Sequence, residues 1–305
     1  MTDYMNLIDK FSDFSKEYGF QVKYNEPMKS HTTFNTGGNA DIFVSPRSFD
    51  ELEAVLKFCK ENDIKPFIVG RGSNLLVKDN GIRGVVIHLG NEFDEVKLID
   101  ENTIVCLSGT SLMKVCKFAL DNGLSGLEFA YGIPGSVGGA AYMNAGAYGG
   151  EMKDVMYKCD HITFDGQYGS YEDDELHLSY RSSVYKDSDK IICRAYFKLK
   201  KGNKDDIRSK MDDLMGRRKA KQPLDYPSAG STFKRPEGFY AGKLIEDCGL
   251  KGANVGDAQV SEKHCGFIIN TGNATSSDVL KLIAIVQDYV LAKTGVFLET
   301  EVKII

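Results

Sequence analysis

Residues 132–139 read Gly-Ile-Pro-Gly-Ser-Val-Gly-Gly, and they lie inside a longer glycine-rich stretch, residues 126–150. This stretch shows neither the period of a helix nor that of a strand. Successive backbone N–H groups in tight turns form concave anion sites, and glycine lets a phosphate approach the backbone closely. Glycine-rich segments are also ordinary turns, so the rest of the chain has to decide between a turn and a binding loop.

A second glycine loop, Gly-Arg-Gly-Ser-Asn at residues 70–74, follows a predicted buried strand at Phe67–Val69. A Rossmann fingerprint would need a third glycine where Leu75 stands. A P-loop is also ruled out, because residues 238–243 are one residue short of its spacing and Leu244 replaces its hydroxyl. A dinucleotide would therefore have to be held by another architecture.

Around these loops the sequence alternates predicted strands and helices, which indicates an α+β protein with two or three subdomains. The predicted strands are residues 67–69, 84–87, 103–107, 162–164, 191–199 and 296–305. The predicted helices are a short amphipathic one with Leu7, Phe11 and Phe14 on one face, one that begins with a capping box at Ser48 and Glu51, and those at residues 111–122, 204–219 and 273–293. The basic run at residues 217–219 before Pro223 predicts a domain boundary.

Composition narrows the class of protein. Of 305 residues, 42% are hydrophobic and 27% charged, which is typical of a soluble globular chain, and the net charge of -5 argues against nucleic acid as a partner. Seven scattered cysteines without a CxxC pair favour a reducing cytosol over a zinc site or a disulfide framework. The N-terminus lacks the features of a signal peptide, and residues 279–298 are interrupted by charges, so no membrane span is predicted.

The polar candidates are ambiguous when each is taken alone. Residues 227–236, PSAGSTFKRP, form either a basic surface turn or a loop that holds the Ser231 hydroxyl for chemistry. Arg181 and Glu301 are, by local pattern, solvated surface charges, and Glu301 lies opposite the apolar face of the predicted terminal strand. Five scattered histidines support neither a metal site nor a catalytic triad.

Taken together and in order, these stretches resemble the UDP-N-acetylenolpyruvoylglucosamine reductase family of flavoenzymes. The matching segments are residues 31–38 (HTTFNTGG), 70–76, 126–139, 144–149 (NAGAYG), 180–181, 222–223, 229–234 (AGSTFK), 267–270 (FIIN) and 301–302. The resemblance runs from His31 to Ile304, and so many colinear matches are far more specific than any single loop.

The resemblance implies an FAD-binding domain of the vanillyl-alcohol-oxidase (PCMH) type in two subdomains, followed by a smaller α+β substrate-binding domain. Residues 1–30 would be an N-terminal helical segment. Residues 31–205 would form the FAD-binding domain, divided near residue 92. Residues 206–305 would form the substrate-binding domain, whose last strand returns to the active-site cleft.

The cofactor that the resemblance implies is FAD, with NADPH as the hydride donor. The backbone of residues 71–75 would hold the FAD pyrophosphate, and residues 132–139 would run along the flavin. Some flavoproteins of this superfold tether FAD through a histidine where Asn74 stands, so we expect non-covalent FAD. The implied cofactor-binding residues are Arg71, Gly72, Ser73, Asn74, Leu75, Gly132, Ile133, Pro134, Gly135, Ser136, Gly138, Gly139, Asn144, Gly146 and Arg218.

The implied activity is the NADPH-dependent reduction of the enolpyruvyl group of UDP-N-acetylglucosamine enolpyruvate to UDP-N-acetylmuramate, for peptidoglycan synthesis. Arg181 and Glu301 match the family's residues that stabilise the negative charge left on the substrate by hydride transfer. Glu301 would need a raised pKa to act as a donor, which requires a desolvated cleft. Ser231 matches the serine that protonates the carbanion.

The family has two forms, and the longer one carries an inserted loop with a tyrosine that closes over the substrate. Between Arg181 and Ser231 the sequence has room for one strand and one helix only, so the shorter form is indicated. The substrate-binding candidates are Tyr148, Lys221, Gln222, Lys234 and Arg235. No metal is expected.

Two other functions stay open at the level of sequence. One is a different FAD oxidoreductase of the same superfold that acts on an alcohol, and the other is a nucleotide-sugar-binding protein without catalysis. The expected location is the bacterial cytoplasm, and the expected partners are the UDP-sugar and NADPH, with no obligate protein partner. Flavin that is bleached by NADPH would exclude the binding protein.

Overall fold

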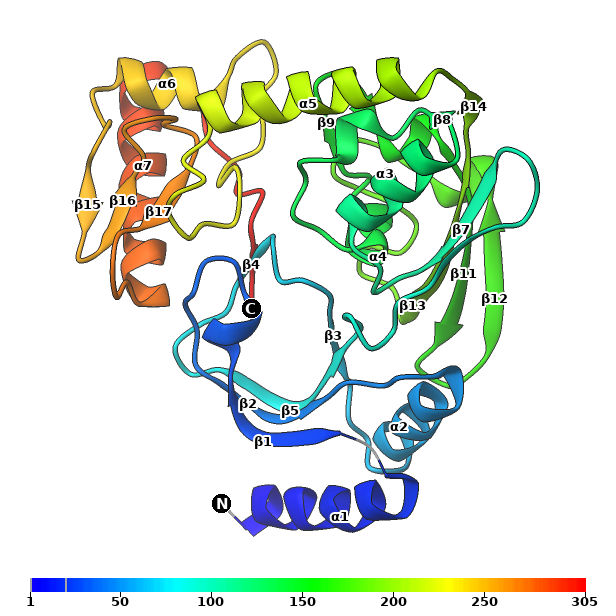
Figure 1. Cartoon of the computed structure of the whole chain (residues 1–305). Helices are drawn as coiled ribbons and strands as arrows, with labels where there is room; N and C mark the ends of the chain where they lie inside the picture. Colours follow the sequence, from blue (N-terminus) through cyan, green and yellow to red (C-terminus); the bar gives the residue numbers. More distant parts are fainter. Residues whose placement is uncertain (1, 20) are drawn as a thin grey trace. The chain divides into compact units, whose positions relative to one another are not determined.

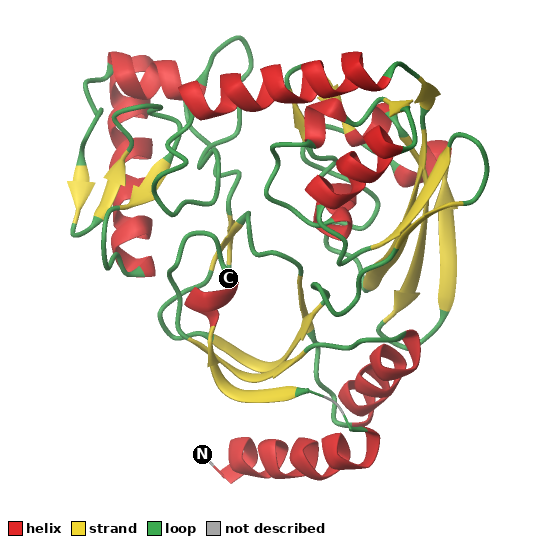
Figure 2. Cartoon of the chain, in the orientation of Figure 1, coloured by secondary structure: helices red, strands yellow, loops and turns green. Residues whose placement is uncertain are grey.

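A computed structural model describes residues 2–19 and 21–305. The chain forms two compact units, and each is assembled from three segments. The first unit consists of residues 1–24, 41–71 and 84–217, and the second of residues 25–40, 72–83 and 218–305. Figures 1 and 2 show the elements of both units.

The first unit contains a small sheet covered by two helices. Its strands have the order β1-β2-β5-β3, and β3 pairs with β5 in parallel. Phe11 of helix α1 is fully buried and packs edge-on against Phe58 of α2, with ring centroids 4.8 Å apart, as the spacing of apolar residues predicts. The bounds are α1 Thr2–Tyr18, β1 Val22–Pro27, β2 Asn39–Val44, α2 Phe49–Glu61, β3 Phe67–Val69 and β5 Ile82–His88.

The start of α2 confirms one half of the predicted capping box. The Ser48 side chain accepts the Glu51 amide N–H, which satisfies one of the unpaired donors of the first turn. The Glu51 carboxylate, however, accepts the amide N–H of Arg47 instead of that of Ser48 and also pairs with the Arg47 guanidinium at 2.6 Å. The return bond of the box is therefore shifted by one residue.

A larger sheet of five strands, in the order β12-β11-β13-β7-β6, forms the other part of the first unit. All of its strand pairs are antiparallel, and α4 packs against β13 and β7. The predicted helix at residues 111–122 is confirmed as α3, which is capped by the Ser111 side chain and ends before Gly123 at φ 65°. The bounds are β6 Val96–Leu98, β7 Thr103–Leu107, α3 Leu112–Asp121, β8 Leu124–Ser125, α4 Val137–Tyr142, β9 Gly146–Ala147, β10 Gly150–Glu151, β11 Met156–Thr163, β12 Tyr168–Glu172, β13 Lys190–Lys198, β14 Lys200–Lys201 and α5 Lys204–Lys221.

The glycine-rich stretch contains more regular structure than its sequence indicates. Helix α4 and the short strands β9 and β10 fall within residues 126–151, where no period is visible. The reason is that α4 is only six residues long, too short to show a helical repeat. Its apolar residues Val137, Ala140 and Ala141 are buried in the core of the larger sheet.

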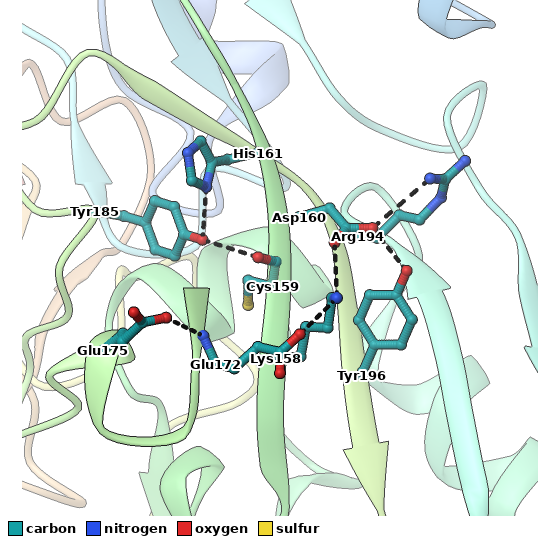
Figure 3. A network of polar contacts seen from close by, with 9 residues as sticks. All are labelled: Lys158, Cys159, Asp160, His161, Glu172, Glu175, Tyr185, Arg194 and Tyr196. Carbon is teal, nitrogen blue, oxygen red and sulfur yellow. Dashed lines mark hydrogen bonds and ion pairs between the residues drawn. The ribbon is translucent and has the colours of Figure 1, made fainter. Parts of the chain in front are cut away.

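A polar network crosses the strands of the larger sheet (Figure 3). Asp160 accepts the Tyr196 hydroxyl at 2.6 Å and lies 3.7 Å from the Arg194 guanidinium. His161, the next residue, points to the opposite face, where it is buried and lies 3.2 Å from the Tyr185 hydroxyl. The alternation of β11 thus separates a solvated ion-pair face from a buried aromatic one.

The second unit is built around helix α7, which packs against strands β15 and β16 and against α6. Figure 1 shows α6 in gold, the strands in orange and α7 in orange to red. The helix is capped at Thr275, and the Asp79 carboxylate accepts the backbone N–H groups of Ser276 and Ser277 at 2.9 and 3.0 Å. The bounds are β4 Leu75–Leu76, α6 Ala241–Asp247, β15 Asn254–Val255, β16 Ala258–Val260, β17 Ile268–Asn270, α7 Ser276–Thr294 and β18 Lys303–Ile304.

The prediction of one long terminal strand at residues 296–305 is wrong. Only Lys303–Ile304 pair as a strand, in parallel with Leu75–Leu76, and Thr300 makes an isolated bridge to Phe233. The predicted alternation nevertheless holds, because Leu298 and Val302 are buried. The segment is extended, but its hydrogen bonds are divided between two partners, so no single ladder forms.

Candidate active site

The loop at residues 71–75 makes a tight turn at position 72, where only glycine fits. Gly72 has φ 60°, and a Cβ atom there would lie 2.0 Å from the carbonyl oxygen of His31. The Gly72 carbonyl accepts the Thr33 amide N–H at 3.3 Å. The amide N–H groups of Arg71, Gly72 and Ser73 donate to no acceptor among the described residues. Successive amides of this kind form a site for an anion such as a pyrophosphate.

The other predicted loop, residues 132–139, packs on the segment between β7 and α3. The amide N–H groups of Val137 and Gly138 donate to the carbonyls of Thr110 and Ser108, both at 2.8 Å. A Cβ atom on Gly138 would lie 2.8 Å from the Ser108 Cβ, so glycine is required for this approach.

Gly70, at the start of the first glycine loop, contacts the second glycine loop within the first unit. A Cβ atom on Gly70 would lie 2.4 Å from the Ser136 hydroxyl oxygen, so these two segments, 66 positions apart in sequence, are in contact. Ser108 lies beside them, and its buried hydroxyl has no hydrogen-bond partner among the described residues. No sequence pattern pointed to Ser108, because its importance depends on which loops pack together.

Asn144 and Arg181 belong to one connected set of loops. Asn144 is fully buried, and its side-chain amide donates to Glu151 at 2.6 Å and to the Ser179 carbonyl at 3.0 Å. Ser179 and Ser182 bridge each other around Arg181, which adopts φ 54° and lies 5.0 Å from the Tyr180 ring. A non-glycine residue in the left-handed region is uncommon and marks a conformation fixed by its surroundings.

The remaining candidates of the first unit lie in β9 and the turn after it. A Cβ atom on Gly146 would lie 2.9 Å from the Gly150 carbonyl oxygen, so β9 and β10 approach closely there. Tyr148 has φ 54° and is 44% exposed. An exposed aromatic ring on a constrained turn is suited to contact a ligand rather than the core.

In the second unit, the loop with Ser231 lies beside the segment with Glu301. The Thr232 carbonyl accepts the Glu301 amide N–H at 2.8 Å, and Phe233 faces Thr300 in the isolated bridge. Thr232 itself is buried, and its hydroxyl accepts the Ile268 amide N–H at 3.0 Å. The predicted proton donor and the predicted carboxyl group thus come from neighbouring backbone segments, 70 positions apart in sequence.

The cations after Ser231 already have partners. The Lys234 ammonium lies 2.7 Å from the Glu299 carboxylate. The Arg235 guanidinium lies over the Tyr240 ring, 4.1 Å from its centroid, and donates to the Phe239 carbonyl at 3.4 Å. Both side chains are partly or fully exposed and can reach a ligand from the surface of the unit.

The end of α5 carries the other candidates of the second unit. Arg218 is half-buried, Lys221 is exposed, and the Gln222 amide N–H donates to the Arg218 carbonyl at 2.8 Å. The Gln222 side-chain oxygen is buried without a hydrogen-bond partner among the described residues. An unpaired buried acceptor is costly, which is typical of a group that serves a ligand.

A glycine-rich turn with unpaired amides and a second glycine loop, on an α+β frame, indicate a flavoprotein of the FAD-binding class. The FAD binding domain family matches residues 40–168, and the C-terminal domain family of UDP-N-acetylenolpyruvoylglucosamine reductase matches residues 222–305. Among the described residues, the free amides of the 71–73 turn fit a phosphate of such a cofactor. Within the first unit, the unpaired hydroxyl of Ser108 beside Gly138 also suits a polar ligand.

The chain belongs to the UDP-N-acetylenolpyruvoylglucosamine reductase family. It is 50% identical to the reductase of Syntrophomonas wolfei over 93% of this chain and 95% of the relative. It is 52% identical to that of Clostridium novyi over 93% and 92%. The crystal structure of the reductase from Thermus caldophilus superimposes with a TM-score of 0.79 at 36% identity and covers 93% of this chain and 98% of its own.

These matches confirm the predicted class of fold and of enzyme. The chain is an FAD-dependent oxidoreductase with an FAD-binding domain, and NADPH is the reductant of the family. Among the described residues no helix has the length and apolarity needed to cross a membrane.

Proposed function

We propose that this protein reduces the enolpyruvyl group of UDP-N-acetylglucosamine enolpyruvate to UDP-N-acetylmuramate, for peptidoglycan synthesis. The identity of about one half to reductases across nearly the whole chain supports this substrate. The observation that carries the proposal is the backbone hydrogen bond between Glu301 and Thr232, because it brings the Ser231 loop beside Glu301.

The reaction adds a hydride and a proton across one carbon–carbon double bond. Held by the glycine loops, FAD would supply a hydride carrier between NADPH and the terminal vinyl carbon. The electron pair of the double bond moves to the adjacent carbon and its carboxylate, so negative charge develops there. The protein must stabilise this charge and supply the proton that removes it.

We assign Arg181 and Glu301 to the stabilisation of that charge. A guanidinium provides a permanent positive charge and paired N–H donors that suit a carboxylate. A protonated Glu301 would donate a hydrogen bond to the same group. The backbone of Glu301 is held by the Thr232 carbonyl and by the Asn74 side-chain amide. These bonds would keep the donor aligned before the charge develops, which is how preorganised sites lower a barrier.

We assign Ser231 to the proton transfer. A hydroxyl is a weak acid and protonates only a strongly basic centre, such as the carbanion next to the carboxylate. Lys234 lies three residues further along, but its ammonium is paired with Glu299, so the basicity of the carbanion is the main driving force of the transfer.

The remaining predicted residues are proposed to bind the cofactor and the sugar nucleotide. Tyr148, Lys221, Gln222, Lys234 and Arg235 would bind the substrate, and the cations among them suit its diphosphate. The glycine loops would hold FAD without a covalent bond, and Arg218 would contact its phosphates. We also propose the domain division at residues 30, 92 and 205, a cytoplasmic location and a function without an obligate protein partner.

Product analysis tests this proposal. With purified flavoprotein, NADPH and the enolpyruvyl sugar nucleotide, we expect a product two hydrogens heavier than the substrate, formed one-for-one with the NADPH consumed. In heavy water, mass spectrometry and NMR should locate one deuterium on the carbon beside the carboxylate. Consumption of NADPH that does not depend on the sugar nucleotide, with release of peroxide, would instead indicate an oxidase.

A further inference from the structure

The side chain of Asn74 makes a hydrogen bond that its assigned place in the cofactor loop does not require. Its amide nitrogen donates to the carbonyl oxygen of Glu301 at 3.1 Å. We propose that Asn74 is a positioning residue for Glu301 and that it acts on the reduction of the substrate through this bond. The inference rests on the function proposed above.

The bond extends a short ladder between the cofactor loop and the end of the chain. Leu75 and Leu76 pair in parallel with Lys303 and Ile304. At the start of this ladder the Lys303 amide N–H donates to the Asn74 carbonyl at 2.9 Å. The Asn74 side chain then makes the next bond, to Glu301, in place of a backbone donor. One residue therefore holds the terminal segment at two positions.

Both peptide groups of Glu301 are fixed as a result. Its N–H is held by the Thr232 carbonyl, and its carbonyl is held by Asn74. The next residue, Val302, is buried in the core of the unit. Without Asn74 the peptide between Glu301 and Val302 loses one of these restraints. Because a displacement of about 1 Å can cost about 10²-fold in rate, this restraint matters for chemistry.

The residue type fits the role. A side-chain amide has N–H donors for a carbonyl acceptor, whereas an ionised aspartate of the same size only accepts and would repel the Glu301 carbonyl. Asn74→Asp thus removes the bond with little change in volume. Asn62 provides a matched control, because its side-chain amide donates to the Phe58 carbonyl at 2.9 Å at the end of α2.

The first measurement separates the two half-reactions. Because Asn74 lies in the predicted cofactor loop, both rates are measured on the fraction of Asn74→Asp that holds FAD, and we expect its reduction by NADPH to be slowed less than its reoxidation. We expect its reoxidation by the enolpyruvyl sugar nucleotide to be at least about 10-fold slower. Asn62→Asp should leave both rates unchanged. Equal losses in both half-reactions, or unchanged reoxidation, would overturn the inference.

A double-mutant cycle tests whether Asn74 acts through Glu301. If it does, Asn74→Asp should slow reoxidation by less than about 2-fold in a Glu301→Gln background, although it slows it about 10-fold alone. Full additivity of the two effects would contradict the proposal. Amide hydrogen exchange of residues 299–305 should also be faster in Asn74→Asp than in Asn62→Asp.

Two outcomes distinguish this inference from the function on which it rests. A wild-type protein that is not reoxidised by the sugar nucleotide refutes the proposed function. A wild-type protein that is reoxidised, with an Asn74→Asp variant that reacts equally fast, refutes only the role of Asn74. If Asn74→Asp does not hold FAD, the same double-mutant cycle is measured with Asn74→Ala. Loss of FAD in both variants would show that Asn74 binds the cofactor and does not position Glu301.

Discussion

Ser231 is the residue to which the most specific chemical role is assigned. It lies half-buried in a loop whose next residue, Thr232, is buried and bonded on both its carbonyl and its hydroxyl. These bonds fix the backbone next to the Ser231 hydroxyl. Proton transfer by a positioned group is worth about 10²–10⁴-fold.

We therefore predict that Ser231→Ala slows reoxidation of the reduced flavin by the enolpyruvyl sugar nucleotide by about 10²–10⁴-fold. Reduction by NADPH needs no proton from Ser231 and should stay within about 2-fold of the wild type. Stopped-flow absorbance of the flavin measures both rates separately.

Ser228→Ala is the matched control for this prediction. Ser228 lies in the same loop, but the contact that the structure assigns to it is made by its backbone carbonyl, which accepts the Thr33 hydroxyl at 2.7 Å. The alanine variant keeps this contact and should retain both rates. Wild-type reoxidation by Ser231→Ala would remove the serine from the mechanism.

At the scale of single residues, the sequence predicts which residues form the candidate site but not the groups to which they are hydrogen-bonded. The requirement for glycine at position 72 is physical, because any side chain there would collide with His31. The side-chain bond from Asn74 to Glu301 joins positions 227 residues apart, and no local pattern contains it. The same holds for Thr232, whose bonds depend on the packing of distant segments.

Strand β11 illustrates what the elements contribute to stability. His161 is 4% exposed, and its ring stacks on Tyr171 with centroids 4.8 Å apart. Its Nδ1 lies 3.2 Å from the Tyr185 hydroxyl (Figure 3). Burial lowers the pKa of His161, and the positive charge of Lys190 lowers it further. The folded protein thus binds this proton less readily than the unfolded chain does.

The sign of the pH dependence follows from this difference. Below the ordinary histidine pKa of about 6.5, the unfolded chain takes up a proton that the folded protein lacks, so the free energy of unfolding falls as the pH falls. We predict that His161→Gln has a flatter dependence than the wild type between about pH 7.5 and 5.5. A tenfold difference in proton affinity between the folded and unfolded states corresponds to about 1.4 kcal/mol of unfolding free energy.

Urea unfolding at several pH values checks this prediction. The variant should keep some pH dependence, because burial also lowers the pKa of His264. Parallel curves for the two proteins would show that His161 does not contribute to the acid sensitivity of the fold.

At the scale of elements, helices with caps and strands with continuous apolar residues could be predicted from the sequence. The Ser111 cap and the Gly123 terminus of α3 are local signals, and strand β7 is a continuous apolar run. Helix α4 could not be predicted, because six residues show no period. The terminal strand was predicted too long, since extension of a segment does not determine how its hydrogen bonds are divided.

At the scale of the whole chain, the two compact units are not continuous in sequence. Segments 25–40 and 72–83 belong to the same unit as residues 218–305. The composition of these short segments does not differ from that of their neighbours. Their membership of the second unit therefore becomes visible only in the contacts of the folded chain. Family membership, by contrast, could be predicted, because colinear motifs accumulate over the whole length of the chain.

The two successive reactions of the bound flavin provide the most direct test of the proposed function. Under anaerobic conditions, the yellow purified protein should be bleached by NADPH, and addition of the enolpyruvyl sugar nucleotide should restore the colour in a one-to-one titration. A bleached protein that stays colourless after this addition, or one that NADPH does not bleach, would contradict the proposed function.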